Sequence, residues 1–199
     1  MKGSIYGIAA EGWPFVVAFL AVAAWLATGP SPAWALLPAG LFVLAIMKFR
    51  DPDREISSAF GVLSPVDGRV MKIERDPDGV RVQLAIAVFS PYLFRSPTEG
   101  KVLESGAENG GHGFRIRTDE GDDVRLRLSG PRWLPAAAGI DYGERVGQGQ
   151  RCGTLRAARQ AEILLPATAV STVKSGEAVI AGKTVLGRFH DENPVIERN

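Results

Sequence analysis

The sequence predicts a mainly β protein, in which a β domain follows an N-terminal helical hairpin that spans a membrane or re-enters it. Two observations support this prediction. Residues 13–28 and 33–49 are almost wholly apolar, with Lys48 as the only charge in either run. Beyond Ser58 the pattern changes to short segments in which apolar and polar residues alternate. Continuous apolar runs are typical of helices in lipid, and a period of two residues is typical of strands with one buried face.

The two apolar runs are each slightly shorter than the ~20 residues with which a perpendicular helix crosses the hydrocarbon core. They therefore fit either two short spans or a re-entrant hairpin, joined by "GPSP". Lys2, Lys48 and Arg50 flank the runs, whereas the connection carries no charge. By the positive-inside rule, both ends and the β domain are expected on the cytoplasmic side of the cell membrane. A cleaved signal peptide, indicated by "SPAWA", and a soluble helical hairpin remain as alternatives.

The changes in pattern divide the chain into four parts: an N-terminal segment (1–12), the hairpin (13–49), a linker (50–58) and the β domain (59–199). The formal net charge is +1, which gives no reason to expect nucleic acid or a strongly acidic partner. A single cysteine, Cys152, excludes an internal disulfide framework and offers no cysteine cluster for a metal. No metal is therefore expected.

The β domain is expected to consist of short antiparallel strands with no long helix. Asp-Gly, Glu-Gly and Gly-Gly turns separate the alternating segments, and "DEGDD" (119–123) is a plain hairpin turn. The expected strands are "GRVMKIE" (68–74), "VRVQLAIAV" (80–88), "KVLES" (101–105), "FRIRT" (114–118) and "VRLRLSG" (124–130).

Residues 144–155 and 177–189 repeat one pattern, in which a β-branched residue, a glycine turn, a polar residue and another glycine precede a strand. Two such turns resemble the barrel-sandwich arrangement of biotinyl and lipoyl carrier domains, although two ordinary β-turns are the alternative. "VMKI", with Lys72, superficially resembles the modified site of those carriers. Period-two alternation places Lys72 in the middle of a strand, whereas the carriers' lysine lies at a hairpin tip. A biotin or lipoate carrier is therefore the less favoured function.

Four segments resemble, in order, the small membrane-anchored phosphatidylserine decarboxylases of bacteria and archaea. They are "FRDPDR" (49–54), "LSPVDGRV" (63–70), "FSPYLFRSPTEGKV" (89–102) and "VGQGQRCGTLRAARQAEILLP" (146–166). The resemblance implies a carboxy-lyase that is made as a proenzyme and cuts itself at a Gly-Ser bond. The serine becomes a pyruvoyl group, which serves as the electron sink when phosphatidylserine is converted to phosphatidylethanolamine.

The family's aspartate and histidine, which activate that serine, match this chain unevenly. Asp67 of "SPVDG" occupies the aspartate position, although Pro-x-Asp-Gly also makes a tight turn without any catalytic role. The segment 90–97 is shorter than the family pattern and contains no histidine. His112 and His190 lie outside the matched positions. His112 remains a candidate displaced base, because a base has only to reach its target in space.

The self-cleavage segment departs furthest from the family, because its Phe-Gly-Ser falls on residues 157–159 and the serine is replaced by Arg159. A guanidinium cannot attack the preceding carbonyl, and Ala158 lacks the backbone freedom of glycine. Neither Gly3-Ser4 nor Gly153-Thr154 is a suitable substitute bond.

We therefore expect a degenerate self-cleavage site at Ala158 and Arg159, an unprocessed chain without a pyruvoyl cofactor, and a candidate pseudoenzyme related to phospholipid metabolism. Its expected partners are membrane phospholipid and a homo- or hetero-oligomeric subunit. Arg159 beside Arg156 either contacts a phosphate or carboxylate or forms a solvated pair. An active pyruvoyl-dependent decarboxylase with a displaced site is the alternative.

Overall fold

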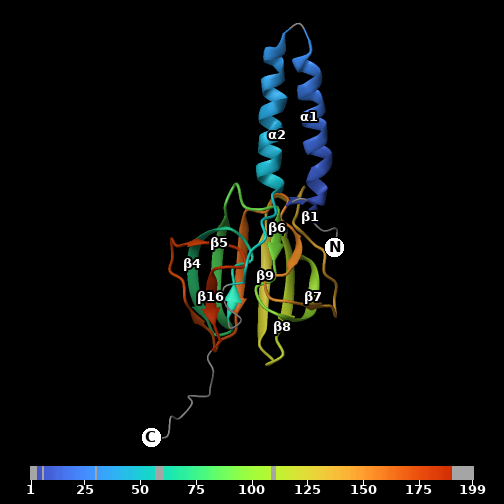
Figure 1. The fold of residues 1–199 in the computed structure, drawn as a ribbon. Helices are drawn as coiled ribbons and strands as arrows, with labels where there is room; N and C mark the ends of the chain where they lie inside the picture. Colours follow the sequence, from blue (N-terminus) through green and yellow to red (C-terminus); the bar gives the residue numbers. More distant parts are fainter. Residues whose placement is uncertain (1–3, 6, 30, 57–60, 109–110, 190–199) are drawn as a thin grey trace, which may run out of the picture.

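The computed structural model describes residues 4–5, 7–29, 31–56, 61–108 and 111–189. Two apolar helices stand on one end of a β domain (Figure 1). The mainly β fold with an N-terminal helical hairpin is therefore confirmed. The N-terminal part contains β1 (Ser4–Ile5), β2 (Ile8–Ala9), the 3-10 turn η1 (Ala10–Gly12), α1 (Trp13–Ala27), the 3-10 turn η2 (Pro32–Ala35) and α2 (Leu36–Phe49).

The hairpin is apolar on all sides and largely uncovered by protein. Each helix with its preceding 3-10 turn gives an 18-residue stretch, Ala10–Ala27 and Pro32–Phe49, with mean hydropathy 1.6 and 1.7. Both stretches are long and apolar enough to cross a membrane by length and composition, and only 11% of each is buried. A helix from a soluble core would be mostly buried, so the exposed hairpin indicates membrane association.

The β domain contains fourteen strands in the described part of the chain. They are β3 (Val62–Leu63), β4 (Gly68–Asp76), β5 (Gly79–Ile86), β6 (Leu93–Arg95), β7 (Gly100–Glu108), β8 (Gly111–Arg117), β9 (Asp123–Ser129), β10 (Ala137–Ala138), β11 (Arg145–Val146), β12 (Arg151–Thr154), β13 (Gln160–Leu165), β14 (Val170–Ser171), β15 (Ala178–Val179) and β16 (Val185–Arg188). Every pairing between them is antiparallel.

The largest sheet has eight strands in the order β11-β7-β8-β9-β13-β5-β4-β15 and curls into a half-barrel. Period-two alternation decides which side chains enter the core. In β9, for example, Val124, Leu126 and Leu128 are buried, whereas Arg125 and Arg127 lie on the other face. Two three-stranded sheets, β10-β12-β6 and β14-β16-β3, accompany the half-barrel.

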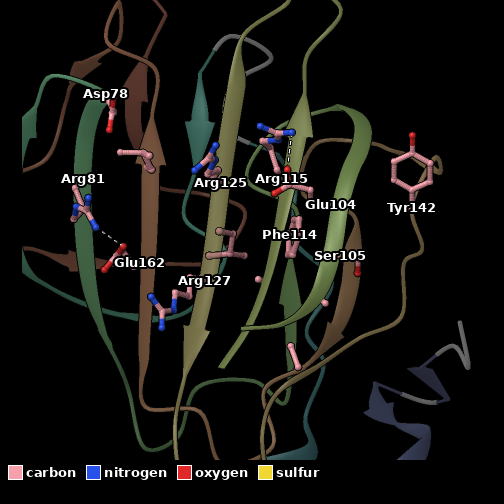
Figure 2. Close-up of a pocket in the computed structure, with 15 residues that line it drawn as sticks. Asp78, Arg81, Glu104, Ser105, Phe114, Arg115, Arg125, Arg127, Tyr142 and Glu162 are labelled. Atoms are coloured by element: carbon pink, nitrogen blue, oxygen red, sulfur yellow. Dashed lines mark hydrogen bonds and ion pairs between the residues drawn. The ribbon is translucent and has the colours of Figure 1, made fainter. Parts of the chain in front are cut away.

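The outer face of the half-barrel carries an open depression of about 610 Å³ across β5, β13, β9, β8 and β7 (Figure 2). Its arginines lie beside carboxylates: Arg81 pairs with Glu162 at 2.8 Å, and Arg115 pairs with Glu104 at 2.6 Å. This face is therefore a network of partly exposed ion pairs, each of which contributes little to stability.

The two repeated turns occupy equivalent places in the β domain. β11 and β15 form the two edges of the eight-stranded sheet, and β12 and β16 are the central strands of the two small sheets. Each pair encloses a glycine with positive φ, Gly149 (φ 69°) and Gly182 (φ 72°), a conformation that side chains with a Cβ rarely adopt. The repeated pattern divides the β domain into two halves. One half contains strands β6–β12, and in the chain it is inserted between β5 and β13, which belong to the other half. The barrel-sandwich prediction is confirmed.

The strand ends on one side of the β domain face the hairpin. The β8–β9 turn lies at the opposite end of the domain (Figure 1), so β9 ends toward the helices. Ser129 at the end of β9 pairs with Gln160 at the start of β13, which pairs with Ala85 near the end of β5. We call residues 86–92, 129–134 and 155–160 the hairpin-facing edge. The contact is direct, because the rings of Phe49 and Tyr92 lie 4.7 Å apart.

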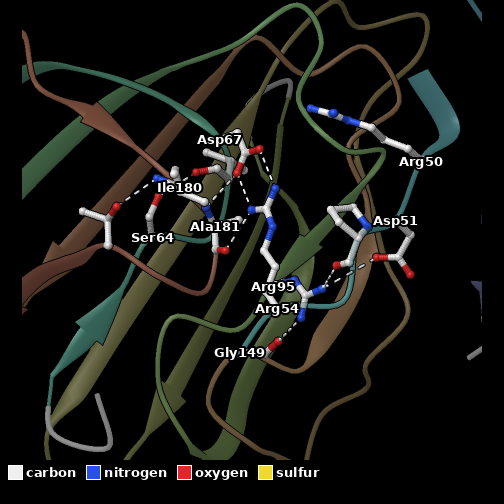
Figure 3. A network of polar contacts seen from close by, with 12 residues as sticks. Arg50, Asp51, Arg54, Ser64, Asp67, Arg95, Gly149, Ile180 and Ala181 are labelled. Atoms are coloured by element: carbon white, nitrogen blue, oxygen red, sulfur yellow. Dashed lines mark hydrogen bonds and ion pairs between the residues drawn. The ribbon is translucent and has the colours of Figure 1, made fainter. Parts of the chain in front are cut away.

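Residues 50–56 of the predicted linker form a strap that binds the hairpin to the β domain (Figure 3). Asp51 is 3% exposed and its carboxylate lies 2.7 Å from Arg151 Nε and 3.7 Å from Arg95 Nη2. Arg95 also donates to the carbonyl of Pro52 at 2.9 Å. The "FRDPDR" segment is thus held by buried ion pairs. The predicted boundary between residues 58 and 59 lies outside the described residues.

Candidate functional site

The position matched to the self-cleaving serine lies in the crossover from β12 to β13, on the hairpin-facing edge. Arg159 has an exposed side chain, and its backbone continues the sheet. Its N–H donates to the carbonyl of Ser129 at 2.9 Å, and its carbonyl accepts from Ile86 at 2.9 Å. The N–H of Ala158 donates to Leu155 at 2.8 Å and closes the turn. Neither Ala158 nor Arg159 carries a hydroxyl or a thiol in its side chain.

Asp67, matched to the family's aspartate, lies just before β4 at the same edge. Arg54 of the strap donates from Nη2 to its Oδ2 at 2.7 Å and from Nη1 to its Oδ1 (Figure 3). The backbone N–H of Ala181 donates to the same Oδ1 at 2.8 Å. The two side chains are 10% and 17% exposed. The carboxylate therefore joins the strap to the β15–β16 turn and is fully engaged in doing so.

His112, the candidate displaced base, lies at the start of β8, opposite Leu128 of β9. Its Nε2 is buried with no hydrogen-bond partner among the described residues, and burial lowers its pKa from 6.5. Sheet order places β8 and β4 each two strands from β13. With about 4.8 Å between neighbouring strands, His112 and Asp67 lie on opposite sides of Arg159, each about 10 Å away along the sheet. The structure brings them to one edge but not together.

The remaining nucleophiles are poorly placed for attack at residue 158. Cys152 is fully buried in β12, and burial raises the pKa of its thiol to about 12. The Gly153-Thr154 bond lies inside the ladder between β10 and β12. Gly3 and His190 lie outside the described residues. Lys72 is in the middle of β4, paired with Glu74, as the alternation predicts, and not at a hairpin tip.

A pocket of about 310 Å³ lies where the hairpin meets the β domain, and we call it the hairpin-base pocket. Its lining comes from the residues just before α1, from β6, β10 and β12, and from Arg156 in the crossover into β13. The lining residues are Ala9, Ala10, Glu11, Leu93, Ala137, Ala138, Gly139, Gly153, Thr154 and Arg156. Most of these residues are small or apolar, and the charged groups in the lining are the carboxylate of Glu11 and the guanidinium of Arg156.

The two charges of this pocket meet at Tyr92. Its hydroxyl donates to Glu11 Oε2 at 2.8 Å. Burial, followed by the Glu11 hydrogen bond, raises the pKa of Tyr92 to about 12, and nearby Arg156 acts in the opposite direction. The phenol therefore stays protonated at physiological pH. The hydroxyl Oγ1 of Thr154 is buried with no hydrogen-bond partner among the described residues.

Arg156 has a positive φ of 49°, the only one among the described non-glycine residues. This conformation costs of order 1–2 kcal/mol for a residue with a Cβ. Such strain concentrates at sites where a side chain must be aimed. The sequence indicated Arg156 only as a neighbour of Arg159, and the structure separates the two: Arg156 lines the pocket, whereas Arg159 is exposed.

The fold and this edge define a membrane-associated barrel-sandwich protein. The two halves of its β domain are connected by the chain at the hairpin-facing edge. The chain is 33% identical over 205 residues to the phosphatidylserine decarboxylase proenzyme of Aromatoleum aromaticum, covering 92% of this chain and 95% of that one. The proenzymes of Nitrosomonas europaea and Symbiobacterium thermophilum are 31% and 33% identical with the same coverage. The chain therefore belongs to the phosphatidylserine decarboxylase family.

The other comparisons add little. No family model matches the chain. Among solved structures, the glucose permease IIA of Mycoplasma capricolum is similar over 64% of this chain and 93% of that one, with 17% sequence identity and a TM-score of 0.45.

The residues of the crossover do not fit the family's pyruvoyl group, because that group is made from a serine and the matched position is Arg159. An arginine has no hydroxyl for the acyl shift and stays protonated.

Proposed function

We propose that this chain is an unprocessed, membrane-anchored member of the family, without a pyruvoyl group, whose β domain lies on the cytoplasmic side and binds phospholipid headgroups. The observation that carries the proposal is Arg159 at the position of the self-cleaving serine. It replaces a nucleophile with a cation that has no exchangeable hydroxyl.

The surroundings of Arg159 support this proposal. Self-cleavage needs a base within hydrogen-bonding reach of the attacking hydroxyl. Asp67 is occupied by Arg54 and by the Ala181 N–H, and His112 lies two strands away. A nucleophile restored at residue 159 would therefore meet neither group in position.

The hairpin-base pocket supports headgroup binding. An aminophospholipid headgroup carries an ammonium and a phosphate, and the pocket offers the carboxylate of Glu11 and the guanidinium of Arg156. Glu11 stands two residues before Trp13, the first residue of α1. If the hairpin enters the bilayer at Trp13, the pocket lies at headgroup depth.

Intact-mass measurement of the membrane-extracted protein tests the absence of processing. We expect one species with the full-length mass and no reaction with hydroxylamine. The proenzyme of Aromatoleum aromaticum, extracted in the same way, is the positive control for cleavage. Two fragments of this chain, the smaller one reacting with hydroxylamine at its N-terminus, would identify a working decarboxylase with a displaced site.

Headgroup binding is tested separately with short-chain phosphatidylethanolamine and phosphatidylserine by native mass spectrometry. We expect Arg156→Gln to weaken binding about tenfold, which corresponds to one charge-assisted hydrogen bond. Arg125→Gln is the matched control and should leave the affinity unchanged, because Arg125 is an exposed arginine on the outer face of the half-barrel and does not line the pocket. Equal affinities for the wild type and both variants would place the headgroup elsewhere.

A further inference from the structure

The hairpin-facing edge exposes four large apolar side chains, which we call the apolar rim. Val88 and Phe89 are 80% and 49% exposed, and Trp133 and Leu134 are 78% and 36% exposed. They come from two turns far apart in the sequence, one after β5 and one after β9. Single exposed apolar residues are common, but paired ones on converging turns mark an interaction surface.

Local hydrogen bonds hold both turns in shape. The N–H of Ser90 donates to the carbonyl of Ala87 at 2.9 Å, so Val88 and Phe89 occupy the middle of a closed turn. The N–H of Leu134 donates to Pro131 at 3.1 Å, which closes the second turn around Trp133. Val88 and Trp133, which lie in the middle of these turns, have the most exposed side chains of the four, at 80% and 78%.

The first turn lies level with the end of α2. Arg50, the residue after this helix, donates from Nη2 to the carbonyl of Phe89 at 3.3 Å. The Phe49 ring, at the helix end, packs against Tyr92. If α2 leaves the hydrocarbon at Phe49, then Phe89 lies at the interface between lipid and water.

The second turn is tied to the same end of the domain. Gly130, where the chain enters the turn, packs so closely on the crossover that a Cβ there would lie 2.8 Å from the Ala157 carbonyl oxygen. Beyond Leu134 the chain runs into Ala137 and Ala138, which line the hairpin-base pocket with Ala9 and Ala10. The chain that follows Trp133 therefore reaches the pocket beside the start of α1.

Exposed cations accompany the rim. Arg50, Arg132 and Arg159 all have exposed side chains on this edge. Apolar side chains interspersed with arginine, next to an apolar hairpin, are complementary to an anionic bilayer surface, where tryptophan is also favoured.

We propose that Val88, Phe89, Trp133 and Leu134 insert into the interfacial region of the leaflet from which the hairpin starts, with Arg50, Arg132 and Arg159 on its phosphate groups. The hairpin-facing edge of the β domain thereby contacts the bilayer directly, so the strap is not the only connection between the β domain and the membrane. This proposal rests on membrane anchorage and not on the absence of processing, so the intact-mass result bears on the proposed function alone.

Tryptophan fluorescence of the full chain, reconstituted in vesicles containing phosphatidylglycerol, tests the docking. Replacing Trp13, Trp25 and Trp34 by phenylalanine leaves Trp133 as the only tryptophan. We expect strong quenching of Trp133 by lipids brominated near the headgroup end of the acyl chain. Quenching by aqueous acrylamide should be several-fold weaker than for a control tryptophan introduced by Glu120→Trp in the β8–β9 turn, at the far end of the domain.

Three results would overturn or support the docking without ambiguity. Acrylamide quenching of Trp133 equal to that of the control would show that the rim faces water. Protection from both acrylamide and brominated lipid would show that protein, such as a second copy, covers it. Quenching by lipid in Trp133 and also in a Phe89→Trp, Trp133→Phe variant of the same background supports docking through both turns. Circular dichroism confirms that each variant retains its fold.

Discussion

Arg159 occupies the position that the sequence matches to the family's self-cleaving serine. The backbone around it is hydrogen-bonded on both sides, to Ser129 and to Ile86. Asp67 is held by Arg54 through two hydrogen bonds. A carboxylate engaged in this way orients the strap, and releasing it for proton transfer would leave the largely buried Arg54 side chain without its carboxylate partner.

Restoring the serine alone should therefore not restore self-cleavage. We expect Arg159→Ser to remain a single full-length chain, because Ala158 replaces the glycine and neither His112 nor Asp67 is in reach of residue 159. Electrophoresis and intact mass of Arg159→Ser, compared with Arg159→Ala, measure this. A cut between residues 158 and 159 in the serine variant only would show that a base is available after all.

His112 should make the stability of the β domain depend on pH. Burial lowers its pKa below 6.5 in the folded protein, so the unfolded chain binds a proton more readily. The free energy of unfolding is therefore expected to fall as pH decreases below about 6.5, and to level off below the folded-state pKa. Thermal unfolding between pH 7.5 and 5 measures the effect. His112→Gln should remove this part of the pH dependence, and an identical profile in the variant would contradict the prediction.

At the scale of elements, the main feature of the hairpin is that the rest of the described protein leaves most of its apolar surface uncovered. Leu20, in the middle of α1, is 53% exposed, and many other large apolar side chains of the two helices are exposed as well. Such exposure to water is unfavourable. A bilayer removes this cost because it replaces water around the helices.

A charge in the hairpin should consequently weaken membrane attachment. Leu20→Arg costs roughly 2.5–3.5 kcal/mol of insertion free energy at the centre of a helix in lipid. We expect a smaller fraction of the variant to resist alkaline carbonate extraction. Met71→Arg is the matched control, since Met71 is 50% exposed on β4 of the β domain. Equal extraction of both variants would favour a hairpin that lies outside the bilayer.

The strands and the hairpin were predictable because each depends on a pattern local to its own segment. The alternation in "VRLRLSG" predicts β9 to within a residue at either end, and the repeated glycine turns predict β11–β12 and β15–β16. Two-residue strands such as β10 and β14 have no room for a period and were not predicted. Their existence depends on the neighbouring strands of the small sheets.

The site was predictable only where one residue carries the chemistry. Arg159 is visible in the sequence because it replaces a required nucleophile. The Glu11–Tyr92 hydrogen bond joins residues 81 positions apart, and no local pattern connects them. The positive φ of Arg156 leaves no mark in the sequence, since turns that need it usually contain glycine. Asp67 is visible in the sequence through its Pro-x-Asp-Gly turn, whereas its partner Arg54 lies in the segment predicted only as a linker.

At the scale of the whole molecule, the strap makes one unit of the hairpin and the β domain. Asp51 forms ion pairs with the arginines of two strands, Arg95 of β6 and Arg151 of β12, and these strands are neighbours in one small sheet. Burial and the nearby Arg151 lower the pKa of Arg95, so the carboxylate between the two guanidinium groups is needed to offset their repulsion. The strap after α2 is thereby fixed to the half of the β domain that contains β6–β12.

Removing the charge of Asp51 should loosen this connection. Asp51→Asn removes the buried counter-ion of Arg95 and leaves Arg151 paired only with the exposed Asp53, and we expect a loss of about 3 kcal/mol, at the low end for buried pairs because Arg151 is 32% exposed. The midpoint of urea unfolding in detergent measures this loss, and limited proteolysis between residues 49 and 61 reports whether the strap has detached. Asp53→Asn is the matched control: Asp53 also pairs with Arg151, at 2.6 Å, but is 96% exposed and should show no measurable change. If the two variants unfold and are cut alike, the hairpin is joined to the domain by the packing of Phe49 on Tyr92, and the strap is an ordinary linker.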